Sequence, residues 1–309
     1  MWSSEAPSNI ALIKYMGKMQ NSRTLVEPYN ISLSYTLHRF FTKVSLENCL
    51  SGDQFISEIN FNKKAVDRFL LHVNHIKNFF NYKGFFLVRS SNNFPHSAGI
   101  ASSSSSFAAL TKCVVTALCD ISCVPLLSPE QMSKISRMSS GSSCRSFFSP
   151  WSVWDSSGAS ALSLKINNLN HDLILIDQTP KKVSSSEAHN LVKSSPLFEG
   201  RLGRARQRFE SLRDALNNDQ WSDARLICRE EFLDMHQLFE TSTPSFRYIQ
   251  PKTDAVLDEI QQFCEINNDG PIVTVDAGPN IHLLWKKDQD EIREELRKII
   301  TLRMSCEII

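Results

Sequence analysis

The sequence predicts an α+β fold in which strands and helices are partly segregated along the chain. Up to residue 178, apolar runs typical of strands alternate with helical periodicity, whereas from Glu187 onward apolar residues recur mainly at helical spacing. A buried-type strand at residues 271–275 then returns shortly before the end. The 309 residues allow one large domain or two moderate ones, and we predict domains at 1–178 and 179–309.

The first domain is expected to begin with an apolar strand, residues 9–13, that ends directly before Lys14. Its later strands are indicated by apolar and β-branched runs, and its helices by apolar residues three or four positions apart. The predicted strands are residues 34–46, 54–61 and 84–91, with further strands between 147 and 176 and the clearest at 173–177; the predicted helices are 63–80, 129–138 and the segment from Ser102 to Leu118.

The second domain is expected to be mainly helical. One helix carries Phe209 and Leu212, a second covers residues 221–239, and a third follows a start signal at Thr253. The strand at 271–275 runs straight into a Gly-Pro turn at 276–280. The last helix places four apolar side chains on one face: Ile292, Leu296, Ile299 and Ile300.

Composition argues against several functional classes. The formal net charge is +1, which does not call for nucleic acid or an anionic membrane as a partner. The arginines between residues 201 and 213 are the basic cluster, and a solvated helix face explains them better than a binding patch. The eight cysteines form no C-x-x-C pair or zinc spacing. Because we find neither a signal peptide nor an apolar run long enough to span a bilayer, we expect a cytoplasmic protein.

Five consecutive serines, Ser102, Ser103, Ser104, Ser105 and Ser106, lie between an apolar strand and a helix. Such a run can be a flexible linker, but a strand, a tight turn at residues 95–99 and a buried helix leave little room for one. Small residues let a ligand approach the backbone, and the free N–H groups of a helix N-terminus favour an anion. The segment therefore predicts a phosphate-binding loop, one richer in hydroxyl contacts than a mixed Ala/Gly loop.

Three other segments could carry chemistry. Lys14 and Lys18 follow the first strand and could meet a substrate anion, although most lysines are solvated surface residues. Arg145 stands among small hydroxyl residues, where its planar fork suits a carboxylate or phosphate, or where it simply edges a turn. Asp276 is delivered by an apolar strand into a rigid turn, as a general base requires, although a turn-capping aspartate fits the same pattern.

Together these segments resemble the GHMP kinase superfamily and, within it, the mevalonate diphosphate decarboxylases. The resemblance rests on NIALIKYMGK (9–18), NNFPHSAGIASSSSSFAAL (92–110), SGSSCRS (140–146) and VDAGPN (275–280), supported by PYNISLSYTL (28–37) and TPKKVSSS (179–186). It implies a GHMP kinase-like two-lobed fold with a ferredoxin-like C-terminal part, and commonly a homodimer. It also implies ATP as cosubstrate, Mg²⁺, and conversion of mevalonate 5-diphosphate to isopentenyl diphosphate, with no nucleic acid or membrane partner.

The resemblance also implies residue roles. Asp276 is the expected base for the 3-hydroxyl, Lys14 its charged neighbour, and Arg145 the group that holds the carboxylate which leaves as carbon dioxide. The positions expected to contact the substrate are Tyr15, Lys18, Ser140, Ser142, Arg145 and Ser185; those expected to contact ATP are Asn93, Gly99 and the serines Ser102, Ser103, Ser104, Ser105 and Ser106. The sequence does not identify a magnesium ligand.

Two departures from the family pattern bear on function. Met16 stands where a tryptophan is common, and Ser186 stands where bacterial relatives often carry arginine. Loss of that guanidinium would remove a charge-assisted contact to the terminal phosphate, which contributes roughly 1.5–3 kcal/mol. A monophosphate substrate, a reaction that stops after 3-phosphorylation, and a non-catalytic metabolite-binding relative are the alternative hypotheses.

Overall fold

The computed structural model describes residues 1–309 except 20–24, 58–62, 95–101 and 180. Its N-terminal half is built on a six-stranded sheet with the order β3-β4-β2-β5-β6, in which β1 also pairs with β2. Among the described strand pairs of this sheet, only β3–β4 is parallel. The strands are β1 (Trp2–Ile13), β2 (Ser32–Cys49), β3 (Gln54–Ser57), β4 (Phe85–Asn92), β5 (Trp151–Asp155) and β6 (Gly158–Leu162).

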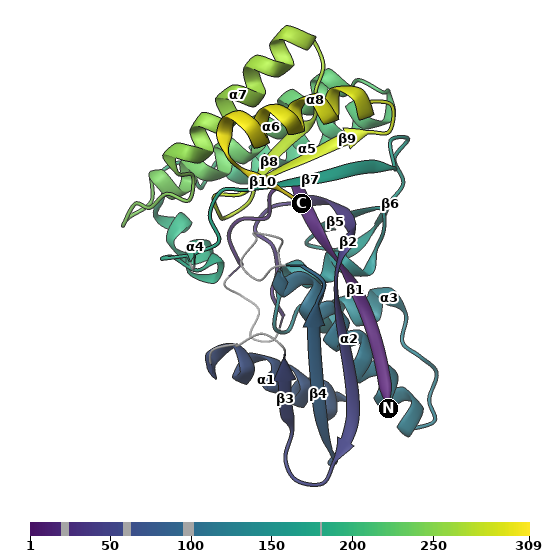
Figure 1. Ribbon diagram of the computed structural model, residues 1–309. Coiled ribbons are helices and arrows are strands. Elements are labelled where there is room, and N and C mark those ends of the chain that lie inside the picture. The colour runs from purple at the N-terminus through teal and green to yellow at the C-terminus, as the bar shows by residue number, and fades with distance from the viewer. Residues whose placement is uncertain (20–24, 58–62, 95–101, 180) are drawn as a thin grey trace.

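Helix α2 (Ser102–Ile121) is the central helix of this half and lies against the sheet (Figure 1). Its residues that pack in the core beneath the sheet are almost completely buried. α1 (Lys63–Phe79), α3 (Pro129–Ser136) and a 3₁₀ helix (Gly141–Phe147) contact it. Contrary to our expectation, residues 103–121 are long and apolar enough to cross a membrane. Because 78% of that window is buried inside the protein, we interpret it as a core helix.

The C-terminal half contains a four-stranded antiparallel sheet with the order β10-β7-β9-β8. Figure 1 shows helices gathered above this sheet. Its strands are β7 (Leu169–Leu175), β8 (Ile272–Val275), β9 (Ile281–Lys286) and β10 (Glu307–Ile308); its helices are α4 (Ser185–Leu191), a short 3₁₀ turn (Val192–Ser194), α5 (Arg201–Asn217), α6 (Trp221–Glu240), α7 (Pro251–Asn267) and α8 (Asp290–Met304).

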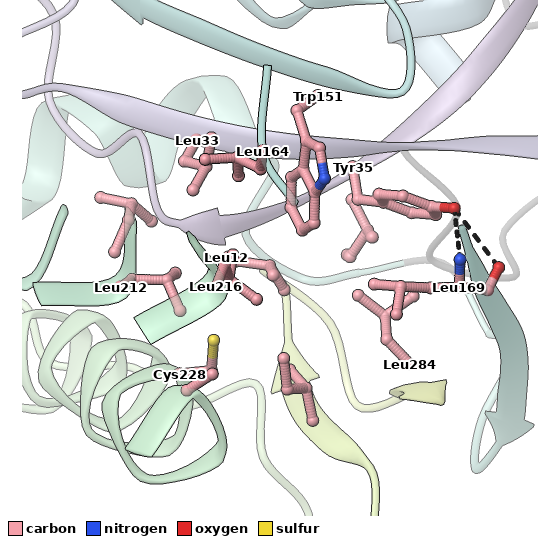
Figure 2. Packing of buried hydrophobic residues seen from close by; sticks show 14 of the residues in the cluster. Leu12, Leu33, Tyr35, Trp151, Leu164, Leu169, Leu212, Leu216, Cys228 and Leu284 are labelled. Atoms are coloured by element: carbon pink, nitrogen blue, oxygen red, sulfur yellow. Dashed lines mark hydrogen bonds between the residues drawn. The ribbon is translucent and has the colours of Figure 1, made fainter. Parts of the chain in front are cut away.

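One hydrophobic cluster joins the two halves. Figure 2 shows Leu12 of β1 and Leu33 of β2 in the same cluster as Leu212 of α5 and Leu284 of β9. Leu12 is completely buried, and truncating such a leucine to alanine typically costs about 2–5 kcal/mol. This shared core fixes the end of β1 relative to the C-terminal sheet.

Several elements differ from the sequence prediction. β9 and β10 were not predicted, because each is a short apolar segment next to a stronger turn or helix signal. α7 begins at Pro251, since Gln250 and Thr253 form a capping box, so the predicted start at Thr253 was two residues late. β7 pairs within the C-terminal sheet although it precedes the domain boundary placed after residue 178, which stays a prediction.

Candidate functional site

Lys14 and Asp276 form the centre of the site, although 262 positions separate them in the chain. Lys14 follows the last residue of β1, and Asp276 begins the tight loop between β8 and β9. The Lys14 Nζ lies 2.5 Å from Asp276 Oδ1. The lysine side chain is 1% exposed and the carboxylate 27%, so the pair leaves one carboxylate face accessible.

The environment lowers the pKa of both groups. Burial lowers the pKa of the Lys14 ammonium, and the neighbouring carboxylates of Asp276 and Glu231 offset only part of that effect. Burial raises the pKa of the Asp276 carboxyl, but the charges of Lys14, His282 and Arg145 outweigh it, and the pKa lies below the usual value. Asp276 is therefore an ionised carboxylate that can accept a proton from a bound hydroxyl.

The Asp276 loop is held by its neighbours. The side chain of Asn280 accepts hydrogen bonds from the backbone N–H groups of Ile176, at 2.7 Å, and Asp177, at 3.0 Å. Thr253 donates to the carbonyl of Pro279 at 2.9 Å. These bonds tie the turn to the end of β7 and to the start of α7, so the carboxylate is aimed by three elements.

Arg145 is a buried cation beside this pair. It lies in the 3₁₀ helix, is 5% exposed and donates through Nη1 to the hydroxyl of Ser32, which in turn donates to the carbonyl of Ile13 at 2.9 Å. Its Nε has no hydrogen-bond partner, and no described acid forms an ion pair with it. A buried guanidinium that forms no ion pair with a described acid is suited to a carboxylate of the substrate.

Tyr15 closes another side of the site. Its ring packs against Trp154 at 4.6 Å and against His189 at 4.4 Å between centroids, and its buried hydroxyl has no hydrogen-bond partner. Position 141 requires glycine, because a Cβ atom there would lie only 2.8 Å from Trp154 and 3.3 Å from the Tyr15 hydroxyl. The tyrosine hydroxyl therefore lies over the 3₁₀ helix that carries Arg145.

Two of the predicted substrate-binding serines lie in this neighbourhood. The hydroxyls of Ser140 and Ser142, at the start of the 3₁₀ helix, are 3.3 Å apart. By contrast, Ser185 is exposed at the start of α4, in the segment that also contains Ser186.

Two further cations near Lys18, Arg68 and Lys193, were not anticipated from the sequence. Gly17 donates its N–H to Nδ1 of His189 at 3.0 Å, which brings Lys18 next to α4. Burial, together with the charges of Arg68 and Lys193, lowers the pKa of Lys18. Burial also lowers the pKa of His189 to about 3, so this ring is neutral. Neither Lys18 nor Lys193 has an ion-pair partner within the described ranges.

Two further basic residues also had no clear sequence signal. Lys181 lies against Gly278, and its ammonium is 5.7 Å from the centre of the Tyr248 ring. Arg201 belongs to the arginine cluster that we expected on a solvated helix face. That interpretation is wrong for Arg201, which is completely buried and paired with Glu231 and Asp234, because α5 turns this position toward α6.

The serine run is only partly turned toward a ligand. Ser103 is exposed, whereas the hydroxyls of Ser105 and Ser106 face Thr42 inside the protein, at 2.7 and 3.4 Å. Ser104 is completely buried, and its hydroxyl has no hydrogen-bond partner. Ser102 begins α2, and the predicted contact at Gly99 lies outside the described residues.

The side chain of Asn93 has a structural use. It accepts from the N–H of Phe41 at 2.8 Å and donates to the carbonyl of Arg39 at 2.7 Å. These bonds join the end of β4 to β2, so the amide is engaged with the backbone.

We expect Ser105→Ala to lower the free energy of unfolding by about 0.5–1.5 kcal/mol and to leave the KM for ATP within about twofold, because its hydroxyl bonds to Thr42. Denaturant unfolding and initial-rate kinetics measure the two quantities. Ser104→Ala is the matched variant, in which the KM for ATP should rise instead. Weaker ATP binding by Ser105→Ala at unchanged stability would contradict this assignment.

The pKa shift of Lys14 predicts a pH effect. Because burial lowers the lysine pKa and the protonated form is needed beside a phosphate, kcat should fall on the alkaline side below the ordinary lysine pKa of about 10.4. The lowered pKa of Asp276 places no acidic limb near neutral pH. A kcat profile from about pH 6 to about pH 10 tests this. In the Lys14→Arg variant the alkaline fall in kcat should disappear. If the fall persists in that variant, a group other than Lys14 causes it.

Within the described part of the chain, no group of three or more His, Cys, Asp or Glu side chains could hold a metal ion. Magnesium at phosphoryl-transfer sites commonly uses one or two carboxylates together with substrate phosphates and waters. The partly exposed Asp276 carboxylate and the unpartnered hydroxyl of Ser104 are oxygen donors of the kinds that such a site uses.

Comparison with known proteins identifies the family. Residues 6–165 match the diphosphomevalonate decarboxylase-like N-terminal domain, and residues 173–306 match the mevalonate 5-diphosphate decarboxylase C-terminal domain. A crystal structure of a mevalonate diphosphate decarboxylase from Legionella pneumophila is 44% identical, with a TM-score of 0.92 over 100% of this chain and 99% of that one.

Two other relatives agree. A structure described as MDDEF in complex with MVAPP, AMPPCP and magnesium is 28% identical, with a TM-score of 0.88, and covers 99% of this chain and 95% of that one. Diphosphomevalonate decarboxylase from Debaryomyces hansenii is 26% identical over 93% of this chain and 80% of its own length. The GHMP kinase-like fold is therefore confirmed, and the chain belongs to the mevalonate diphosphate decarboxylase family.

Proposed function

We propose that this chain converts mevalonate 5-diphosphate and ATP to isopentenyl diphosphate, ADP, phosphate and carbon dioxide, and that Asp276, Lys14 and Arg145 carry the chemistry. The observation that supports these roles is the 2.5 Å Lys14–Asp276 pair beside a buried arginine that has no acidic partner among the described residues. Relatives of this family are named for the same reaction, and one was solved with MVAPP and an ATP analogue.

Arg145 is proposed to bind the carboxylate of the substrate. Its free guanidinium edge offers parallel N–H groups, while Ser32 holds the Nη1 side. The unpartnered Tyr15 hydroxyl and the hydroxyls of Ser140 and Ser142 supply further donors next to it. The substrate then lies with its 3-hydroxyl toward Asp276.

Asp276 is proposed to accept the proton of the 3-hydroxyl as that oxygen attacks the γ-phosphorus of ATP. A tertiary alcohol is a poor nucleophile, and a positioned base typically contributes about 100-fold to 10,000-fold. The Lys14 ammonium stabilises the charge on the phosphoryl group in transfer. The products of this step are ADP and a 3-phosphorylated intermediate.

Decarboxylation then needs no further base. The C–C bond to the carboxylate breaks, its electron pair forms the new double bond, and the C–O bond to the 3-phosphate breaks to release phosphate. Arg145 fixes the plane of the carboxylate, while positive charge develops at the carbon that loses phosphate. The buried side chains around the site exclude water, which would otherwise trap such a carbon.

The start of α2 is proposed to receive the phosphates of ATP through its free N–H groups, with Ser103 and Ser104 as side-chain donors and Lys181 as a nearby cation. Magnesium, when bound, would neutralise phosphate charge, and Asp276 and Ser104 are the side chains available to hold it.

Eight free cysteines support a reducing, cytoplasmic location, and we propose a homodimer by likeness to the family.

Lys18, Arg68 and Lys193 are proposed to bind the 5-diphosphate of the substrate. Bacterial relatives often carry an arginine at the position of Ser186, and in this chain cations from three other elements would take its place. Among the described residues none of the three is paired with an acid, and the mutual charge that lowers the pKa of Lys18 is relieved when an anion binds.

Paired turnover of mevalonate 5-diphosphate and mevalonate 5-phosphate, with ADP and carbon dioxide both measured, tests the proposed function. We expect equal amounts of the two products and a preference for the diphosphate. ADP without carbon dioxide would contradict decarboxylation. Lys193→Ala should raise the KM for the diphosphate by about tenfold, as expected for one charge-assisted contact, and change that for the monophosphate less. Equal effects on both substrates would remove Lys193 from the terminal phosphate.

A further inference from the structure

A completely buried ion pair lies directly behind Lys14. Arg201, the first residue of α5, and Glu231, in α6, have side chains that are 0% exposed. The guanidinium meets the carboxylate with both of its terminal nitrogens, one of them at 2.9 Å. Buried ion pairs are often no more stable than an apolar replacement of similar volume, because both charges lose their hydration. Stability alone therefore does not account for this one.

The ion pair bonds to both backbone groups of Lys14. The N–H of Lys14 donates to Glu231 Oε1 at 2.8 Å, and its carbonyl accepts from Arg201 Nη2 at 2.9 Å. Pairing of β1 with β2 ends at Ile13, so Lys14 has left the sheet. Asn30 also donates to the carbonyl, at 2.9 Å. The Lys14 backbone is therefore held by two side chains of the C-terminal half together with Asn30 of the N-terminal half.

The same pair acts on the charge of Lys14. The carboxylate of Glu231 opposes the effect of burial on the lysine pKa, and it adds to the larger effect of Asp276. The titratable and charged groups packed around Lys14 come from the β8–β9 loop, α5 and α6: Asp276, Arg201, Cys228, Glu231 and His236. Burial holds His236 neutral, with a pKa of about 3, and raises the pKa of Cys228, so neither supplies a counterion near neutral pH.

We propose that Arg201 and Glu231 are positioning residues that hold the backbone of Lys14 and keep its ammonium directed at Asp276. This inference rests on the proposed role of Lys14 in phosphoryl transfer. The pair fixes the lysine without occupying its side chain, which stays available to Asp276 and to the phosphoryl group.

The test compares two carboxylates that bind the same arginine. Glu231→Gln keeps shape and removes the charge next to Lys14, whereas Asp234→Asn removes a charge that contacts Arg201 at 2.6 Å without contacting Lys14. We expect Glu231→Gln to lower kcat by about tenfold or more, with KM values within about threefold, and to move the alkaline limb of kcat to lower pH. Asp234→Asn should leave that limb in place. Equal movement of the limb in both variants, or in neither, overturns the proposal.

A second variant covers a failure of Glu231→Gln to fold. Arg201→Met with Glu231→Leu replaces the whole pair by apolar side chains, which buried pairs tolerate. We expect a folded protein with reduced kcat, and wild-type kcat would overturn the proposal. Lys14→Met separates the two claims. Full turnover in Lys14→Met contradicts the role of Lys14 itself, whereas its loss together with normal kcat in the double variant contradicts only the positioning role.

Discussion

Asp276→Asn should lower kcat by about 100-fold to 10,000-fold, the range that a positioned general base contributes. The amide keeps the size of the side chain but cannot accept the proton of the 3-hydroxyl. It also leaves the buried ammonium of Lys14 without its 2.5 Å counterion, so the lysine pKa should fall further. The KM values should change little, because the proposed substrate-binding cations are Arg145, Lys18, Arg68 and Lys193 and not Asp276. Steady-state kinetics with both products quantified measures the loss.

Asp258→Asn is the control for this variant, since Asp258 is exposed on α7 and distant in sequence from every residue assigned to the site. Its kcat should equal that of the unmodified protein. A loss below about tenfold in Asp276→Asn would show that the carboxylate is not the base. A loss in kcat accompanied by a comparable loss of thermal stability would assign part of the effect to folding.

Arg145→Lys should lower kcat/KM for the substrate by roughly tenfold to 150-fold, the equivalent of about 1.5–3 kcal/mol for a charge-assisted hydrogen bond. Lysine keeps the charge but loses the planar fork, so it cannot hold Ser32 and the substrate carboxylate together. We also expect more ADP than carbon dioxide per turnover, because a carboxylate held in the wrong plane leaves slowly. Simultaneous assay of both products measures this ratio.

Arg206→Lys is the matched control, because Arg206 is 59% exposed on α5, where it pairs with Glu210 one turn away. It should leave both products unchanged. Near-normal turnover in Arg145→Lys, with equal amounts of ADP and carbon dioxide, would show that two-pronged contact to the carboxylate is not needed. The ratio of products thus separates a defect in decarboxylation from one in substrate binding.

The candidate site was predictable where a residue type and its local sequence both carried a signal. Asp276 stands between an apolar strand and a Gly-Pro turn, and Arg145 stands in a run of small residues. Arg68, Lys181 and Lys193 had no such signal, because a basic residue on a helix or loop usually faces solvent. Their proposed part in the site rests on tertiary contacts: the charges of Arg68 and Lys193 act on Lys18, and Lys181 lies against Gly278.

For the serine run, too, the sequence predicted one part and the tertiary packing decided the other. Its place between a strand and a helix predicted the start of α2, which the structure confirms. The direction of each hydroxyl was not predictable, because helical rotation turns Ser105 and Ser106 toward Thr42 of β2. Only the partner strand, fixed by long-range pairing, determines which serines face the protein.

The sequence by itself determined the fold class and most of the helices, since periodicity and turn chemistry are local, and its resemblance to a family singled out Lys14, Arg145 and Asp276 as candidates. The resemblance implied that Lys14 neighbours Asp276, and the tertiary structure supplies the 2.5 Å contact between them. Only the tertiary structure decided that Arg201 lies buried behind Lys14 and not in solvent. The physical reason is that burial and charge pairing depend on contacts between distant segments. A shared core between β1, α5, α6 and β9 creates those contacts.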